Sequence, residues 1–288
     1  MRLKRQQLVV PLYLCILCQV IYSFITLGAV PCTARELLFG GLCAAIAVSI
    51  LLFVLFVLGR ILAEGAGTPW KKAVDVLLCI LFLCAVVQTV AQQVQIYQIQ
   101  FDKGVIWVVV LAGCALALRA TVHAFLRCAR LLFAFCVVVA VGALLGLIGQ
   151  SDLHNLSAQG LTATGICAGF WMGCTLFPEY FAILIAAPKR QTGAGQGAAA
   201  WIAMPFFALG AQFAVVFCAE LIFGMQSAGV GGFECLRSWA LLNFSRYDGM
   251  VVLLWLLIAF FRLRFFAFLA AQVNPFVLQN QEKKVDQK

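Results

Sequence analysis

The sequence is poor in charge. Asp, Glu, Lys and Arg make up 11% of its 288 residues, whereas an ordinary soluble domain carries about 25%. Apolar residues reach 64%, and the mean hydropathy is +1.04. So little charge cannot cover a soluble globule, which excludes that class. The composition predicts an all-α polytopic membrane protein, because helices satisfy their own backbone hydrogen bonds in lipid.

The motifs that mark common catalytic and cofactor sites are also missing. The chain has no GxxxxGK[ST] loop, no GxGxxG after a strand, no HExxH, no GxSxG and no paired carboxylates. His123 has no second ligand at metal spacing. We therefore expect no enzyme, no cofactor and no metal. The net charge of +9 does not indicate a nucleic-acid partner, because the basic residues cluster between apolar spans, where they set membrane orientation.

Cysteine, by contrast, is plentiful at 13 residues. Most of them lie within apolar segments, where a free thiol behaves as a small hydrophobe. Cys15 and Cys18 have the CxxC spacing of zinc or redox sites but no second pair nearby, so we interpret them as packing residues. Cys32 and Cys235 fall in predicted outer loops, and the sequence leaves open whether they pair.

Eight apolar segments predict eight transmembrane helices. They cover residues 8–30, 37–59, 73–94, 104–120, 128–149, 160–187, 199–223 and 249–270. The first run is too long for the core of a cleavable signal peptide. We expect a transmembrane domain over 1–272 and a polar cytoplasmic tail over 273–288. Sixteen of the 20 Lys and Arg residues fall in segments assigned to one side, so both termini should be cytoplasmic.

Residues 161–187, within the sixth segment, form the most irregular stretch. Gly169 and Gly173 interrupt it, and Pro178 and Glu179 follow. Freed backbone groups or an ionisable side chain at membrane depth indicate a functional site, and transporters hold substrates at interrupted helices. The competing interpretation is a helix whose small residues pack against a neighbour. The segment alone does not decide between the two.

Other spans add candidates for such a site. Gly28 precedes a proline in the first span, where the helix either ends or breaks to offer its backbone to a ligand. Gln88, Thr89 and Gln92 lie in the third span, and amides in a membrane helix require partners across an interface or in a cavity. Arg262 interrupts the last span, where it either reaches the inner leaflet or lines a pathway.

Taken in order, these landmarks resemble the endospore germination permeases, the B subunits of nutrient germinant receptors in the amino acid–polyamine–organocation superfamily. ITLGAVP at 25–31 resembles the glycine-containing first helix of that family. LRATVHAFLRCARLLFAF keeps two arginines of its entry to the fifth helix, with Thr121 in place of glycine and His123 in place of glutamate. DLHNL resembles its junction before the sixth helix. FSRYDGMVVLLWLLIAFFRLRFFAFLAA resembles its eighth helix, with Ser245 in place of glutamate.

That family usually has ten spans in two inverted repeats of five helices, so the resemblance implies a truncated five-plus-five transporter-like bundle. It also implies a receptor subunit that binds an amino acid or a similar small nutrient between the interrupted first and sixth helices. The expected location is the bacterial cytoplasmic membrane, here the inner membrane of the spore. The expected partners are A- and C-type receptor subunits and membrane lipid.

Two alternatives to a receptor subunit remain open. One is a secondary amino-acid transporter driven by an ion gradient, and the other is a structural subunit with a decayed site. For a receptor subunit or a secondary transporter, the predicted ligand-binding residues are Thr26, Gly28, Gln88, Gly169, Phe170, Trp171, Gly173, Glu179 and Arg262.

Overall fold

Helices make up almost all of the described structure. The computed structural model describes residues 6–26, 32–64, 69–100, 113–115, 119, 122–147, 160–174, 178–186, 198–224 and 247–273. These ranges contain no β-strand, which confirms the all-α prediction. The predicted fourth span, 104–120, lies mostly outside them.

Five of the described helices are long and apolar enough to cross a membrane. Each contains an apolar stretch of at least 19 residues, close to the ~20 residues that cross the hydrocarbon core. Such helices are compatible with an integral membrane protein. They are α1 (Gln6–Thr26), α2 (Ala34–Glu64), α3 (Pro69–Gln100), α9 (Met204–Phe223, preceded by the short α8, Ala198–Ile202) and α11 (Tyr247–Val273).

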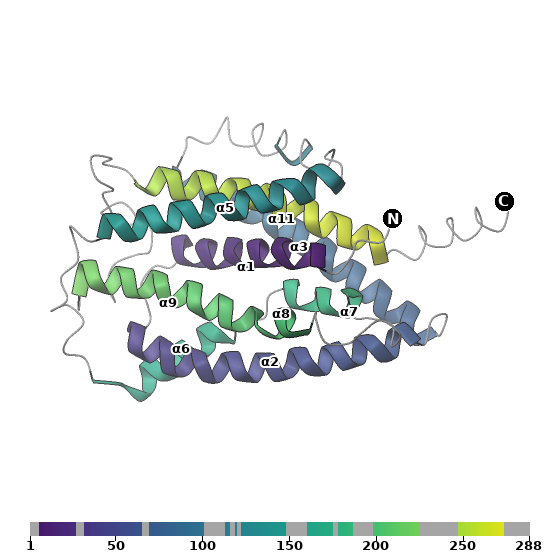
Figure 1. Cartoon of the computed structure of the whole chain (residues 1–288), viewed down its shortest axis with the longest axis horizontal. Helices are drawn as coiled ribbons and strands as arrows, with labels where there is room; N and C mark the ends of the chain where they lie inside the picture. The colour runs from purple at the N-terminus through teal and green to yellow at the C-terminus, as the bar shows by residue number, and fades with distance from the viewer. Residues whose placement is uncertain are drawn as a thin grey trace.

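Helix α1 lies in the middle of the bundle (Figure 1). It packs against α5 (Val122–Leu147), α9 and α11. Its first turn and the last turn of α11 lie at the same end of the bundle in Figure 1. Helix α2 runs along one edge, where it contacts α9 and α6 (Ala163–Gly173).

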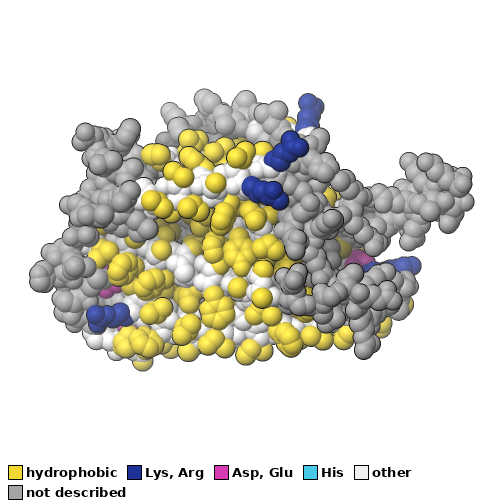
Figure 2. Space-filling view, viewed as in Figure 1, with side chains coloured by type: hydrophobic (Ala, Val, Ile, Leu, Met, Phe, Trp, Pro, Cys, Tyr) yellow, Lys and Arg dark blue, Asp and Glu magenta, His cyan; other side chains and the backbone are white. Residues whose placement is uncertain are grey.

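Much of the outer surface is apolar. Leu42 and Ile50 of α2 and Leu77 of α3 are exposed, as side chains that face lipid are. In Figure 2 the described part of one face is largely apolar, with basic side chains toward its upper right and lower left. This distribution is the one expected where lipid tails cover the middle of a helix bundle and water reaches its ends.

Glycines bring α2 and α6 into backbone contact. Gly165, Gly169 and Gly173 recur at every fourth residue and so line one face of α6. A Cβ on Gly169 would lie 2.7 Å from the Glu36 backbone oxygen, and one on Gly40 would lie 2.1 Å from a backbone oxygen of α6. Only glycine permits so close an approach, which is a common solution for helix pairs in membranes.

The Glu36 carboxylate joins the N-terminal ends of these two helices. Its Oε2 accepts from the Thr33 N–H at 2.9 Å, and the Thr33 hydroxyl accepts from the Glu36 N–H at 3.3 Å, which is a capping box for α2. Its Oε1 accepts from the Thr162 N–H at 2.9 Å and from the Thr162 hydroxyl. That hydroxyl accepts from the Gly165 N–H at 3.0 Å and so caps α6. One side chain therefore fixes α6 to α2.

Glu36→Gln should lower the free energy of unfolding by about 2 kcal/mol. The neutral amide has one acceptor oxygen where the carboxylate has two, and a hydrogen bond to a charged group contributes roughly 1.5–3 kcal/mol. SDS titration in mixed micelles measures the difference. Thr33→Val is the matched control, because it removes only the α2 cap and should cost about 1 kcal/mol. Equal losses in the two variants would contradict the double role of Glu36.

Candidate functional site

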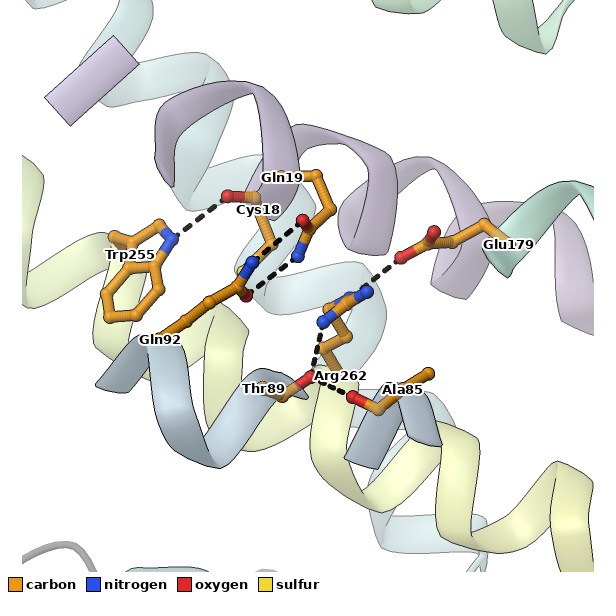
Figure 3. A network of polar contacts seen from close by, with 8 residues as sticks. All are labelled: Cys18, Gln19, Ala85, Thr89, Gln92, Glu179, Trp255 and Arg262. Atoms are coloured by element: carbon orange, nitrogen blue, oxygen red, sulfur yellow. Dashed lines mark hydrogen bonds and ion pairs between the residues drawn. The ribbon is translucent and has the colours of Figure 1, made fainter. Parts of the chain in front are cut away.

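A buried ion pair lies between α1, α3 and α11 (Figure 3). Arg262 of α11 donates from Nε to Glu179 Oε1 at 2.7 Å, and both side chains are 0% exposed. Glu179 belongs to the 3-10 helix η2 (Pro178–Ala182), which follows α6 in sequence. A single charge at this depth is costly, so each of the two groups depends on the other for charge compensation.

Helices α1 and α3 supply further polar side chains beside Arg262. Its Nη1 donates to the Thr89 hydroxyl, which donates in turn to the Ala85 carbonyl at 2.7 Å. Beside Arg262, the amides of Gln19 and Gln92 exchange two hydrogen bonds of 3.0 Å. If both amides are turned over, this pair is kept and the Gln19 oxygen accepts from Arg262 Nη1 at 2.9 Å. We refer to Gln19, Thr89, Gln92, Glu179 and Arg262 as the polar cluster.

Polar contacts continue along α1 and α3 beyond this cluster. One turn further along both helices, the Tyr22 hydroxyl donates to Gln95 Oε1 at 2.6 Å. The Tyr22 ring stacks on Trp255 with 5.9 Å between centroids, and the Trp255 indole N–H donates to the Cys18 carbonyl at 2.9 Å. Polar side chains therefore line the seam between α1, α3 and α11.

Glu179 keeps one carboxylate oxygen unused. Its Oε2 is buried and has no hydrogen-bond partner among the described residues, although an unpaired buried acceptor costs roughly 1–3 kcal/mol. This oxygen can accept a hydrogen bond from an N–H or O–H group of a bound molecule. Arg262 can recognise a carboxylate through its planar fork of donors. The cluster thus contains complementary groups for a molecule that carries both an ammonium and a carboxylate.

The structure brings two of the predicted site residues into direct contact, Glu179 and Arg262. Thr26 lies at the end of α1, where its hydroxyl donates to a carbonyl of its own helix at 2.9 Å. Gln88 and Trp171 are exposed on the outer faces of α3 and α6, Trp171 at 74%. These three residues therefore lie apart from the polar cluster.

The sixth segment is interrupted, but its glycines contact α2. Helix α6 ends at Gly173, and helical structure resumes at Pro178 in η2 and continues in α7 (Ile183–Ala186). Gly169 and Gly173 face α2, and Phe170 beside them is half-buried. This geometry favours the packing interpretation for the two glycines. Gly28, at the other predicted break, lies outside the described residues.

Sequence reasoning does not identify Gln19. It is the only amide in the apolar stretch Leu8–Thr26, and an isolated amide in a membrane helix is itself a signal for a buried partner. The third span contains three polar candidates, of which Thr89 and Gln92 are buried while Gln88 is exposed. Which of them belongs to the site depends on the face that α3 turns toward α11, and a lone sequence does not contain that information.

The described cysteines are free thiols. Cys15 and Cys18 are buried in α1. The Cys32 thiol donates to Met172 Sδ at 3.9 Å, and burial raises the pKa of Cys32 to about 11. The reactive thiolate of Cys32 is therefore scarce at neutral pH. Cys235, with which Cys32 could pair, lies outside the described residues.

Comparison with known proteins adds no assignment, because no family model, curated protein or solved structure matches the chain.

Proposed function

We propose that the chain is a permease-like integral membrane protein that binds an amino acid or a similar small nutrient at the polar cluster. The observation that carries this proposal is the fully buried Arg262–Glu179 pair, whose carboxylate retains an unpaired oxygen. Ionisable side chains inside a membrane bundle are costly and usually functional.

A zwitterionic ligand suits this pair electrostatically. Its carboxylate would take the place of Glu179 at Arg262, and its ammonium would take the place of Arg262 at Glu179, so no net charge is buried. Glu179 lies on a short 3-10 helix that is separate from α6. It can therefore move relative to Arg262 without unwinding a long helix, which gives the interrupted sixth segment its role in binding.

The resemblance to endospore germination permeases extends the proposal to a germinant receptor in the inner spore membrane. In that setting A- and C-type subunits would be the partners, and both termini would be cytoplasmic. The same-end position of the start of α1 and the end of α11 (Figure 1) supports an even number of spans, as an arrangement of eight helices from two inverted repeats requires. Co-purification with A- and C-type subunits from sporulating cells tests the assembly.

An amino acid that fits should raise the Tm of the purified protein in a saturable way. Binding to the folded state stabilises it by about 2.7 kcal/mol when the ligand is present at a hundredfold excess over Kd. Thermal unfolding with a panel of L-amino acids identifies the ligand. The amide of that amino acid, and the amine left when its carboxylate is removed, should each lose most of the rise in Tm. No shift with any amino acid would favour a structural subunit with a decayed site.

The variants for this experiment follow from the cluster. Glu179→Gln should abolish the shift, whereas Gln88→Ala is a matched control on the exposed face of α3 and should keep it. Thr89→Val retains the ion pair, so it serves as a milder test if Glu179→Gln does not fold. An unchanged shift in both cluster variants would place the ligand elsewhere.

Flux separates the receptor subunit from the secondary transporter. The protein is reconstituted into liposomes with a proton or sodium gradient, and uptake of the amino acid that raises its Tm is measured. Binding without accumulation supports the receptor subunit. Concentrative uptake would make the chain a transporter.

A further inference from the structure

A second candidate site lies between the beginning of α2 and the second half of α9. It is a cavity of about 210 Å³. It shares no residue with the polar cluster. Among the described residues, its lining comes from these two helices: Ala34, Arg35, Leu38, Phe213, Phe217 and Glu220.

The acidic group beside this cavity is Glu220, and one of its two carboxylate oxygens already accepts a hydrogen bond. Glu220 is 8% exposed, and its Oε2 accepts from the Ala34 N–H at 2.9 Å, at the first residue of α2. Its Oε1 has no hydrogen-bond partner among the residues that the structure describes. A carboxylate that is more than nine-tenths buried and keeps one oxygen without a partner beside a cavity can accept a hydrogen bond from a cationic donor.

The basic group and the apolar wall complete the site. Arg35 is exposed at the rim. The Phe213 and Phe217 rings stack with 5.5 Å between centroids, and Leu38, opposite them, is 44% exposed. The accessible wall of the cavity is therefore almost wholly apolar, and one anion and one cation flank it.

The position of the cavity along the helices indicates its depth. The apolar span of α2 begins at Ala34 and that of α9 ends at Phe223, so the charged groups lie where headgroups meet the hydrocarbon core. Leu38 and the two rings lie one turn or more further into the apolar spans. A ligand that fits has a zwitterionic head and an apolar tail.

We propose that this cavity binds a phospholipid with a primary ammonium, phosphatidylethanolamine, independently of any ligand at the polar cluster. Its phosphate contacts Arg35, its ammonium donates to Glu220 Oε1, and an acyl chain lies along Leu38 and the two rings. A choline headgroup has no N–H to donate to the carboxylate. A glycerol headgroup leaves the lipid anionic, so its charge is unfavourable beside Glu220.

Lipid binding to the delipidated full-length protein in detergent micelles tests the proposal. Native mass spectrometry should show about tenfold tighter binding of phosphatidylethanolamine than of phosphatidylcholine or phosphatidylglycerol, since one charge-assisted hydrogen bond is worth at least a factor of ten. Glu220→Gln should remove the preference for phosphatidylethanolamine. The amide oxygen of the new side chain still caps α2, so the Tm of the lipid-free variant should stay close to that of the original protein. Arg35→Gln should weaken all three phospholipids.

Two further arms keep the test decisive. Free phosphoethanolamine carries the same headgroup without acyl chains and should bind far more weakly. If it binds as tightly as the lipid, the site takes a soluble amine phosphate and the lipid proposal is overturned. Equal binding of the three lipids, or an unchanged preference in Glu220→Gln, would also overturn it. Gln88→Ala, on the outer face of α3, controls for non-specific lipid contact and should retain the preference.

Discussion

Glu179→Gln should lower the free energy of unfolding by about 3–5 kcal/mol, which is the largest loss we expect from a substitution that preserves side-chain volume. The variant leaves the fully buried Arg262 guanidinium without an anion, and a buried charge without compensation costs about that much. SDS titration in mixed micelles measures the loss directly, and thermal unfolding in detergent should report a lower Tm.

A double-mutant cycle tests whether the two charges stabilise each other. Arg262→Met should cost a similar amount alone, because it leaves Glu179 charged and unpaired. The double variant, Glu179→Gln with Arg262→Met, should recover most of the loss, because no charge is then buried. Arg262→Lys is the intermediate control, since it keeps the charge but loses the planar fork that reaches both Glu179 and Thr89. Additive losses would show that the pair does not interact.

The same cycle bears on function. Apolar residues of similar volume often replace a buried ion pair without loss of stability, so stability alone is a weak reason to keep Glu179 and Arg262. If the double variant is as stable as the original protein but no longer responds to amino acids, the pair serves ligand recognition. If the double variant is unstable as well, the pair is part of the structure.

Much of the helical architecture is predictable from apolar runs. The predicted span 249–270 agrees closely with α11, Tyr247–Val273. The predicted span 73–94 falls short of α3, which continues to Gln100, because glutamine lowers hydropathy while remaining a good helix former. The sixth segment, predicted as a single apolar span, consists in the described residues of separate helical pieces, and a proline without an N–H opens the second.

The contacts within the sites are less predictable, because they join residues far apart in the chain. Glu179 and Arg262 stand out individually, as charges in apolar segments, but nothing in the sequence pairs two residues 83 positions apart. Similarly, the spacing from Thr33 to Glu36 is a recognisable capping box, whereas the second helix end that Glu36 caps, at Thr162, is 126 residues away. A polar side chain in an apolar span predicts its own burial, because exposing it to lipid is costly. Its partner, however, depends on the rotation and packing of the helices.

Gly169→Ala should lower the free energy of unfolding by about 3 kcal/mol. The added Cβ would lie 2.7 Å from the Glu36 backbone oxygen and 2.8 Å from Leu37 Cα, and backbone atoms cannot rotate away as a side chain can. Such overpacking costs roughly 1–3 kcal/mol or more, which exceeds the gain of up to about 1 kcal/mol that alanine brings to a helix. SDS titration measures the result, and Gly40→Ala, across the same contact, should behave alike and non-additively.

Gly210→Ala is the matched control, because a Cβ at that position in α9 would meet nothing within 4 Å. It should leave stability unchanged or slightly raised, and an equal loss there would refute the contact argument for Gly169. The Gly169 variant also separates the two interpretations of the sixth segment. If the glycine serves packing, the variant loses stability but still responds to an amino acid below its lowered Tm, because the polar cluster lies on α1, α3, η2 and α11. If its backbone binds the ligand, the response disappears while stability is retained.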